Sequence, residues 1–193
     1  VDITTRGGSF VVKGATDDGD AFGDNSASNF AGSFRSKSST TIVTTGKSDT
    51  DGGSVSIKTV SRNPGSGATT GHILIEGDIT TSGGAASSSN AGNDAGSVTL
   101  ETTTNTSTIT FSTGADVIAK GSDANGGELN GGAGGAVTIT TANDSVITFH
   151  DTLIETDGGA KSGNGTAGAG GTITINDPLQ IGTGTVKLQT GAE

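Results

Sequence analysis

The stretch Gly135-Ala-Val-Thr-Ile-Thr-Thr141 decides the fold. Its apolar residues alternate with polar ones, which is the pattern of a half-buried β-strand. The pattern occurs four times, always after a glycine corner, and its first apolar residues are Val55, Val98, Val137 and Ile173. Their spacings of 43, 39 and 36 residues indicate one structural unit that repeats along the chain.

A second alternating segment follows each copy and a third follows the first three copies, as Thr108–Ser112 and Asp116–Lys120 do in the middle of the chain. Residues 1–52 fit the same frame with an insertion, and 193 residues then divide into five coils of about 39 residues. Three short strands per coil predict an all-β, right-handed, single-stranded parallel β-solenoid of about five coils without helices. Each strand is expected to pair with its equivalent one coil away.

The alternation also names the expected core. Strand one contributes Phe10, Val12, Val55, Ile57, Val98, Leu100, Val137, Ile139, Ile173 and Ile175. Strand two contributes Phe34, Ile73, Ile75, Ile109, Phe111, Ile147, Phe149, Val186 and Leu188. Strand three contributes Ile3, Ile42, Ile79, Val117 and Ile154, with Thr5, Thr44, Thr81 and Thr156 inward or near the corner. The Gly-rich corners between strands, including 83–95, 121–134 and 177–184, are expected to be solvated turns with positive φ.

The composition excludes several classes of protein. Val, Ile, Leu and Phe number only 37 residues and the net charge is −10, so a thick, aromatic-rich enzyme core is excluded and a thin repeating core is favoured. The chain has no Cys, so no disulfide or thiolate site is possible. Ten scattered basic residues form no stripe for nucleic acid, and no apolar run is long enough for a membrane helix.

The two ends of the sequence match each other. Residues 188–193 are interpreted as a second strand with its turn, and residues 1–8 as a third strand, so that the joined ends resemble the internal corner 111–117. We therefore expect residues 1–193 to be one solenoid segment that continues head to tail, either fused in tandem or stacked; an arbitrary cut through a larger solenoid is the alternative. The missing Met supports a segment of something longer. The residues expected in self-association are Val1, Asp2, Ile3, Thr4, Thr5, Val186, Lys187, Leu188, Gln189 and Thr190.

Acidic residues gather in two corner loops and are separated by Gly and other small residues. Oxygen-rich loops of this kind suit Ca²⁺, although the spacing matches neither an EF-hand nor the Asp-containing nonapeptide repeat. Ca²⁺ is thus the one candidate cofactor, none being required, and a solvated acidic loop is the alternative. The candidate ligands are Asp17, Asp18, Asp20, Asp24, Asp49 and Asp51.

The outward strand columns argue against an enzyme. They are small and mostly neutral, and they lack the clustered carboxylates and the Trp or Tyr platforms that sugar-cleaving sites use. His72 and His150 fall in different coils and are interpreted as surface residues. The column Ser56, Thr99, Thr138 and Thr174 suggests ice binding, but its neighbouring column is interrupted by Lys58 and Glu101, and Thr stacking for sheet stability explains it equally well.

The runs Gly135–Thr141, Ile147–Phe149, Leu153–Gly159 and Gly163–Ile175 resemble the repeats of large bacterial exoproteins of the filamentous-haemagglutinin type and similar β-strand-repeat surface adhesins. The resemblance covers nearly the whole chain and is weakest in residues 14–52. It implies a secreted right-handed β-helix at the cell surface that serves as a stalk, filament or sheath, with no catalytic residues. The alternative is an adhesin stalk whose corner loops bind host or matrix glycans.

Overall fold

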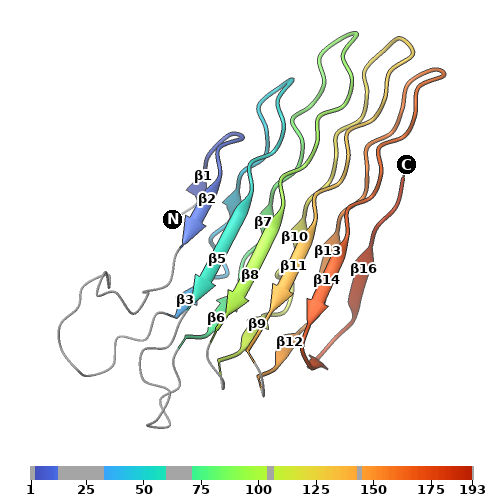
Figure 1. Cartoon of the computed structure of the whole chain (residues 1–193). Coiled ribbons are helices and arrows are strands. Elements are labelled where there is room, and N and C mark those ends of the chain that lie inside the picture. Colours follow the sequence, from blue (N-terminus) through green and yellow to red (C-terminus); the bar gives the residue numbers. More distant parts are fainter. Residues whose placement is uncertain (1–2, 13–32, 60–70, 104–106, 143–144, 193) are drawn as a thin grey trace.

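A computed structural model describes residues 3–12, 33–59, 71–103, 107–142 and 145–192. These residues form sixteen short β-strands and no helix (Figure 1). Among them, therefore, no helix is long and apolar enough to cross a membrane. The strands lie in three parallel sheets, and each sheet contains every third strand of the chain.

The first sheet has the order β14-β11-β8-β5-β2 and the second β15-β12-β9-β6-β3, while the third, with six strands, runs β1-β4-β7-β10-β13-β16. The first sheet consists of β2 (Phe10–Val12), β5 (Val55–Thr59), β8 (Val98–Thr102), β11 (Val137–Thr140) and β14 (Ile173–Asn176). The second consists of β3 (Phe34–Arg35), β6 (Ile73–Ile75), β9 (Ile109–Phe111), β12 (Ile147–Phe149) and β15 (Leu179–Ile181). The third consists of β1 (Ile3–Thr4), β4 (Ile42–Val43), β7 (Ile79–Thr80), β10 (Val117–Ile118), β13 (Thr152–Glu155) and β16 (Val186–Gln189).

The predicted parallel β-solenoid is thus confirmed. Val98, Val137 and Ile173 are register partners across neighbouring strands of the first sheet, as the sequence spacing requires. The first and second sheets each contain five strands and therefore four coil-to-coil steps, so the solenoid makes about four turns, slightly fewer than the five coils predicted.

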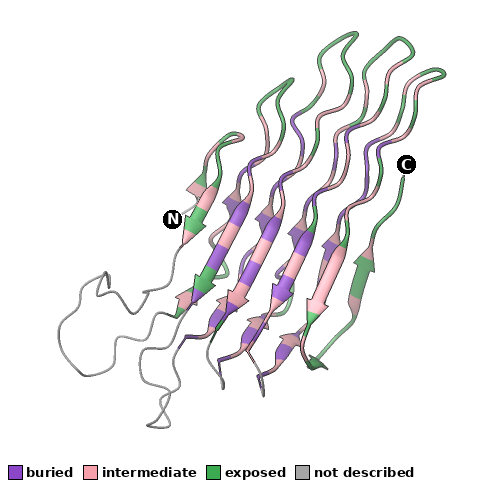
Figure 2. Cartoon of the chain, viewed as in Figure 1, coloured by how far each residue is buried: buried purple, intermediate pink, exposed green. Residues whose placement is uncertain are grey.

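The core is a narrow column of stacked apolar side chains between the three sheets. Figure 2 shows the buried residues in purple along the strands in the middle of the solenoid. Strands β6, β9 and β12 alternate between buried and half-buried residues, as period-two patterning demands. Phe111 and Phe149 are fully buried and stack one coil apart, with their ring centroids 4.8 Å apart. At the two ends of the solenoid the column is only half covered, which leaves Ile3 and Ile173 partly exposed.

Threonines line both edges of the core. Thr44, Thr81 and Thr156 are buried as predicted, and their hydroxyls donate to glycine carbonyls; the Thr81 Oγ1 to Gly96 O distance is 2.7 Å. A second buried threonine column at the end of the first-sheet strands was not predicted. It consists of Thr59, Thr102 and Thr141.

The sequence-based assignment of the last coil is wrong. Val186 and Leu188 were expected on strand two, but β16 pairs with β13 in the third sheet, with Leu188 opposite Ile154. The second-sheet strand of this coil is β15, which lies inside the expected corner 177–184. Both described ends of the third sheet are therefore third strands, β1 and β16.

Hairpin-like arms follow β4, β7, β10 and β13 and extend beyond the sheets (Figure 1). In the arm 121–135, amide groups three residues apart donate to the arm of the next coil, 158–171, as Gly131 N does to Thr166 O and Gly134 N to Ala169 O. Other amides donate within or between arms, as Gly132 N does to Ser122 O. This three-residue period is that of the polyproline II conformation, which has no hydrogen bonds of its own. The arms are therefore held by backbone contacts, not by a side-chain core.

Candidate functional site

Both ends of the described solenoid have unpaired strands. Within the described residues, β1, β2 and β3 at one end and β14, β15 and β16 at the other each have a partner on one side only. The C-terminal end exposes Leu179, Ile181 and Leu188, whose exposed fractions are 45%, 57% and 48%. Unpaired parallel edges with apolar residues are templates for the addition of further strands. Residues 3–5 and 186–190, named from the sequence, all lie at these ends, whereas Val1 and Asp2 fall outside the described residues.

A column of glycines runs along the solenoid where each arm returns to the first sheet. Its members are Gly8, Gly53, Gly96, Gly135 and Gly171. A Cβ placed on any of the last four would lie 2.1–2.2 Å from the carbonyl oxygen of the column member one coil earlier. Because no atom fits at that distance, only glycine allows the coils to approach so closely. In the sequence, these five glycines stand at the start of the first strands without a reason for glycine there, and none of them has positive φ.

The two described residues of the predicted calcium site take part in contacts between coils. Asp49 accepts hydrogen bonds from Asn90 Nδ2, Ser87 Oγ and Ser87 N, and these bonds, the one from Asn90 first, lower the pKa of its carboxyl. Asp51 accepts from Asp94 N at 2.9 Å. Asp17, Asp18, Asp20 and Asp24 lie outside the described residues. In the described part of the chain, no three His, Asp or Glu side chains are grouped so as to hold a metal ion.

Outward polar side chains form ladders that point one coil forward. Asp94 Oδ1 accepts from Ala133 N at 2.7 Å, and Asp116 Oδ1 accepts from Leu153 N at 2.8 Å. His72 Nδ1 accepts from Thr108 N at 2.9 Å and His150 Nδ1 from Thr183 N at 3.1 Å, which leaves the proton of each neutral ring on Nε2. Both histidines therefore accept a backbone hydrogen bond from the next coil. Their different columns in the sequence did not indicate this shared role.

Ion pairs also join neighbouring coils. The Arg35 guanidinium forms two hydrogen bonds with the Glu76 carboxylate, and this contact raises the pKa of Arg35 and lowers that of Glu76. Lys58 Nζ lies 2.8 Å from Glu101 Oε1 in the outward column of the first sheet. This pair interrupts the threonine surface beside the column of Ser56 and Thr99, as the sequence suggested.

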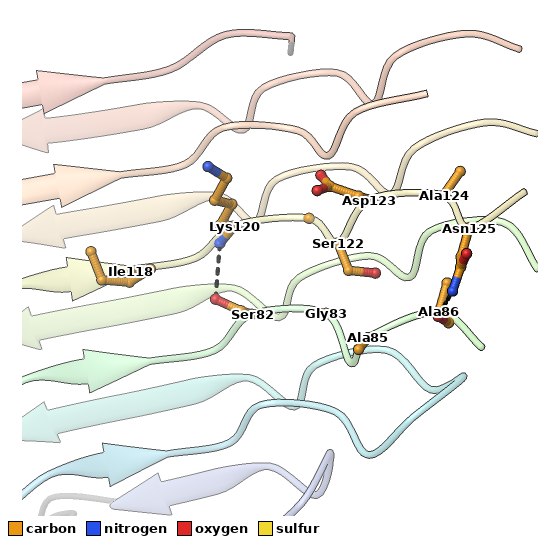
Figure 3. A pocket seen from close by; sticks show the side chains of 11 residues that line it. Ser82, Gly83, Ala85, Ala86, Ile118, Lys120, Ser122, Asp123, Ala124 and Asn125 are labelled. Carbon is orange, nitrogen blue, oxygen red and sulfur yellow. Dashed lines mark hydrogen bonds between the residues drawn. The ribbon is translucent and has the colours of Figure 1, made fainter. Parts of the chain in front are cut away.

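A shallow groove of about 490 Å³ is lined by residues from the segments 82–86 and 118–125, where two neighbouring arms begin (Figure 3). Its lining includes Ser82, Lys120 and Asp123. Ser82 Oγ accepts from Lys120 N at 3.4 Å, Lys120 Nζ lies 3.3 Å from Glu155 Oε1, and Asp123 Oδ1 accepts from Ala160 N at 2.8 Å. The polar groups of Ser82, Lys120 and Asp123 in its lining therefore already have partners within the chain.

Three comparisons with known proteins gave no match: no family model, no curated protein and no solved structure is similar to this chain at a significant level. The repeat architecture is therefore established by the structure alone. The likeness to bacterial exoproteins is consistent with a β-helix and extends no further.

Proposed function

We propose that this chain is a structural unit of an extracellular filament, stalk or sheath on a microbial surface, and that copies associate end to end. The open ends of all three sheets carry the proposal, above all the apolar residues that the C-terminal end exposes. If these edges were buried against another coil, their backbone N–H and C=O groups would be hydrogen-bonded. The edges would then no longer be templates for aggregation. Catalysis is not part of the proposal.

The net charge and the amino-acid composition support a role outside the cell. A net charge of −10 favours solubility and keeps rods apart laterally, so that association is directed to the ends. The chain has no Cys or Met to be oxidised. The resemblance of its repeats to those of large bacterial exoproteins agrees with a mechanical role at a surface.

Electron microscopy of negatively stained protein tests the proposal. We expect particles that lengthen with protein concentration while keeping the width of a single solenoid. Leu188→Lys places a charge on the exposed apolar end and should shorten the particles, whereas Thr99→Lys on the outward face of β8 should leave their length unchanged. Single short particles at every concentration would refute end-to-end association.

The groove beside Lys120 favours a second candidate, an adhesin stalk that binds glycans through its corners. A glycan array separates the two functions. Binding that is lost in Asp123→Ala, with unchanged particle length, would support the adhesin; absence of binding on a broad array would refute it.

A further inference from the structure

The N-terminal strand β1 lies where the last strand of another copy would have to lie. The third sheet has six strands and the other two have five, so β1 extends one coil beyond β2 and β3. If one copy continued the solenoid of another, with its β2 on β14 and its β3 on β15, its β1 would coincide with β16 of the other copy. Only one of these two strands can therefore pair with β4 in a continuous solenoid.

Strands β1 and β16 hold equivalent positions in the third sheet. Ile3 lies opposite Ile42 of β4, and Leu188 lies opposite Ile154 of β13. Ile42 and Ile154 belong to the same core column. However, β1 forms two register pairs with β4, whereas β16 forms four with β13. Strand β1 therefore has less pairing to lose than β16 can provide.

The threonines that follow these strands show the same equivalence. The Thr5 hydroxyl donates to Gly8 O, as the buried threonines of the inner coils donate to the glycine before the next first-sheet strand. Thr190 is at this position after β16, and the described chain has no further glycine of this kind for it. Its hydroxyl donates instead to Gly171 O, at 2.6 Å. Gly8 of a following copy would give Thr190 the partner that the other threonines have.

We propose that copies add end to end by strand exchange: β16 of one copy displaces β1 of the next and pairs with its β4, while β14 lies on β2 and β15 on β3. Leu188 then lies opposite Ile42. The exchange covers the apolar residues that the C-terminal end exposes, and in the single chain β1 caps the opposite end. The inference rests on the proposed function, and it adds the polarity of the contact and a strand that must leave before it forms.

The exchange also supplies a reason for glycine at position 8. At the other four members of the glycine column, the preceding coil places a carbonyl oxygen 2.1–2.2 Å from the Cβ position. At Gly8 the nearest described atom is Thr5 O at 3.4 Å, an ordinary contact, and its φ is not positive. A side chain would therefore fit in the single chain. After the exchange, the Gly171 carbonyl of the other copy would occupy this position.

A reversible disulfide tests the exchange in the full chain, which has no cysteine. Thr4 and Val43 are register partners, and neighbouring strands are about 4.8 Å apart, within the range that a disulfide spans. Oxidised Thr4→Cys with Val43→Cys should stay monomeric in sedimentation velocity, and the reduced protein should assemble as the wild type does. Thr80→Cys with Ile118→Cys is the matched control. These register partners lie in the inner strands β7 and β10, so this variant should assemble in both redox states.

Crosslinking between copies reports the new register. The exchange places Gln189 of one copy opposite Val43 of the next. Val43→Cys with Gln189→Cys should therefore form a ladder of crosslinked multimers under oxidation. Within one chain these positions are four strand spacings apart, about 19 Å, too far for a disulfide. Thr4→Cys with Gln189→Cys should crosslink less efficiently, because β1 no longer lies in the sheet.

Gly8→Ala should affect the assembly alone. The variant should keep the melting temperature of the wild-type monomer, since its Cβ meets only ordinary contacts, and it should remain monomeric where the wild type assembles. Gly191→Ala is the control. Its Cβ would lie 3.7 Å from Asp157 Oδ1, an ordinary contact, so we expect assembly as in the wild type.

The outcomes separate the two proposals. A wild-type chain that stays monomeric at all concentrations overturns the proposed function and with it this inference. If the wild type assembles, equal assembly of the oxidised Thr4–Val43 variant or of Gly8→Ala overturns the strand exchange alone. A Thr4–Gln189 ladder as efficient as the Val43–Gln189 ladder would mean that β16 meets β1 in place, and would also overturn it.

Discussion

The body of the solenoid and its arms hold neighbouring coils together in opposite ways. The body stacks Ile, Val, Leu and Phe in a thin core, and its strands alternate with period two. The arms 83–96 and 121–135 pack backbone against backbone, with a three-residue period and glycines whose missing side chains make room for carbonyl oxygens. The body is therefore stabilised by what its side chains bury, and the arms by the absence of side chains at the contact points.

The comparison predicts that damage to the body is global. Phe111→Ala removes a fully buried ring that stacks on Phe149, and it should lower the free energy of unfolding by about 3–5 kcal/mol. Urea titration followed by circular dichroism measures this loss. Phe111→Leu is the control and should cost less than about 1.5 kcal/mol. A near-neutral Phe111→Ala would mean that the stacked core does not dominate the stability of the body.

Damage to an arm should be smaller and local. Gly132→Ala puts a Cβ 2.0 Å from Asn93 O, so the two arms must separate, yet the sheets beneath need not open. We expect a cost of about 1–3 kcal/mol. Hydrogen exchange should accelerate at Ser122, Gly132 and Gly159, but not in β8 or β11. Ala133→Ser, at a neighbouring position that already carries a side chain, is the control; equal acceleration in the strands would contradict the separation of arm from body.

Charges between coils should contribute less than either kind of packing. Lys58 and Glu101 form an exposed pair, with 47% and 35% of their side chains accessible, so a double-mutant cycle with Lys58→Ala and Glu101→Ala should give a coupling of about 0.2–1 kcal/mol. The coupling should shrink in 1 M salt. A salt-independent coupling of several kcal/mol would mean that ion pairs contribute as much to the free energy of unfolding as core packing does.

The smallest effect is expected from acid, at one junction between arms. Hydrogen bonds from Asn90 and Ser87 lower the pKa of Asp49, so their stabilisation is complete above its unfolded value of about 3.9 and is lost as pH falls through the lower folded value. Amide exchange at Ser87 should therefore quicken in strong acid, after correction for the intrinsic rate. Asp49→Asn should remove this dependence. Unchanged protection of Ser87 in acid would show that the carboxylate does not hold the junction.

Much of the body was predictable from sequence, because burial on one face imposes alternation. The registers of Val55, Val98 and Val137 follow directly from their spacing. The last coil was misassigned because Val186-Lys-Leu188 alternates equally well as a second or a third strand, and only the pairing with β13 distinguishes them. The buried Thr102 was missed since a polar residue after an apolar alternation usually marks the strand end at the surface.

The arms and the open ends were harder to derive. Glycine-rich sequence carries no hydrophobic periodicity, so the corners were predicted to be solvated turns with positive φ, whereas Gly132 and Gly134 lie close to neighbouring carbonyl groups and do not have positive φ. For the acidic candidates, spacing alone did not show that the carboxylates of Asp49 and Asp51 would accept hydrogen bonds from backbone amides of the next coil. Such contacts depend on which coils become neighbours, and that is fixed only once the register is known.

The direction of the coil-to-coil hydrogen bonds has a mechanical consequence. These bonds run along the axis of the solenoid. A pulling force on its two ends therefore acts on the coil-to-coil interfaces one after another, and each interface bears the full force. Because β4, β7 and β10 have only two residues each, the third sheet has the fewest paired strand residues per coil-to-coil interface. Additional coils would thus increase the reach of a rod without increasing its tensile strength, while its resistance to bending would come from the three sheets that surround the core.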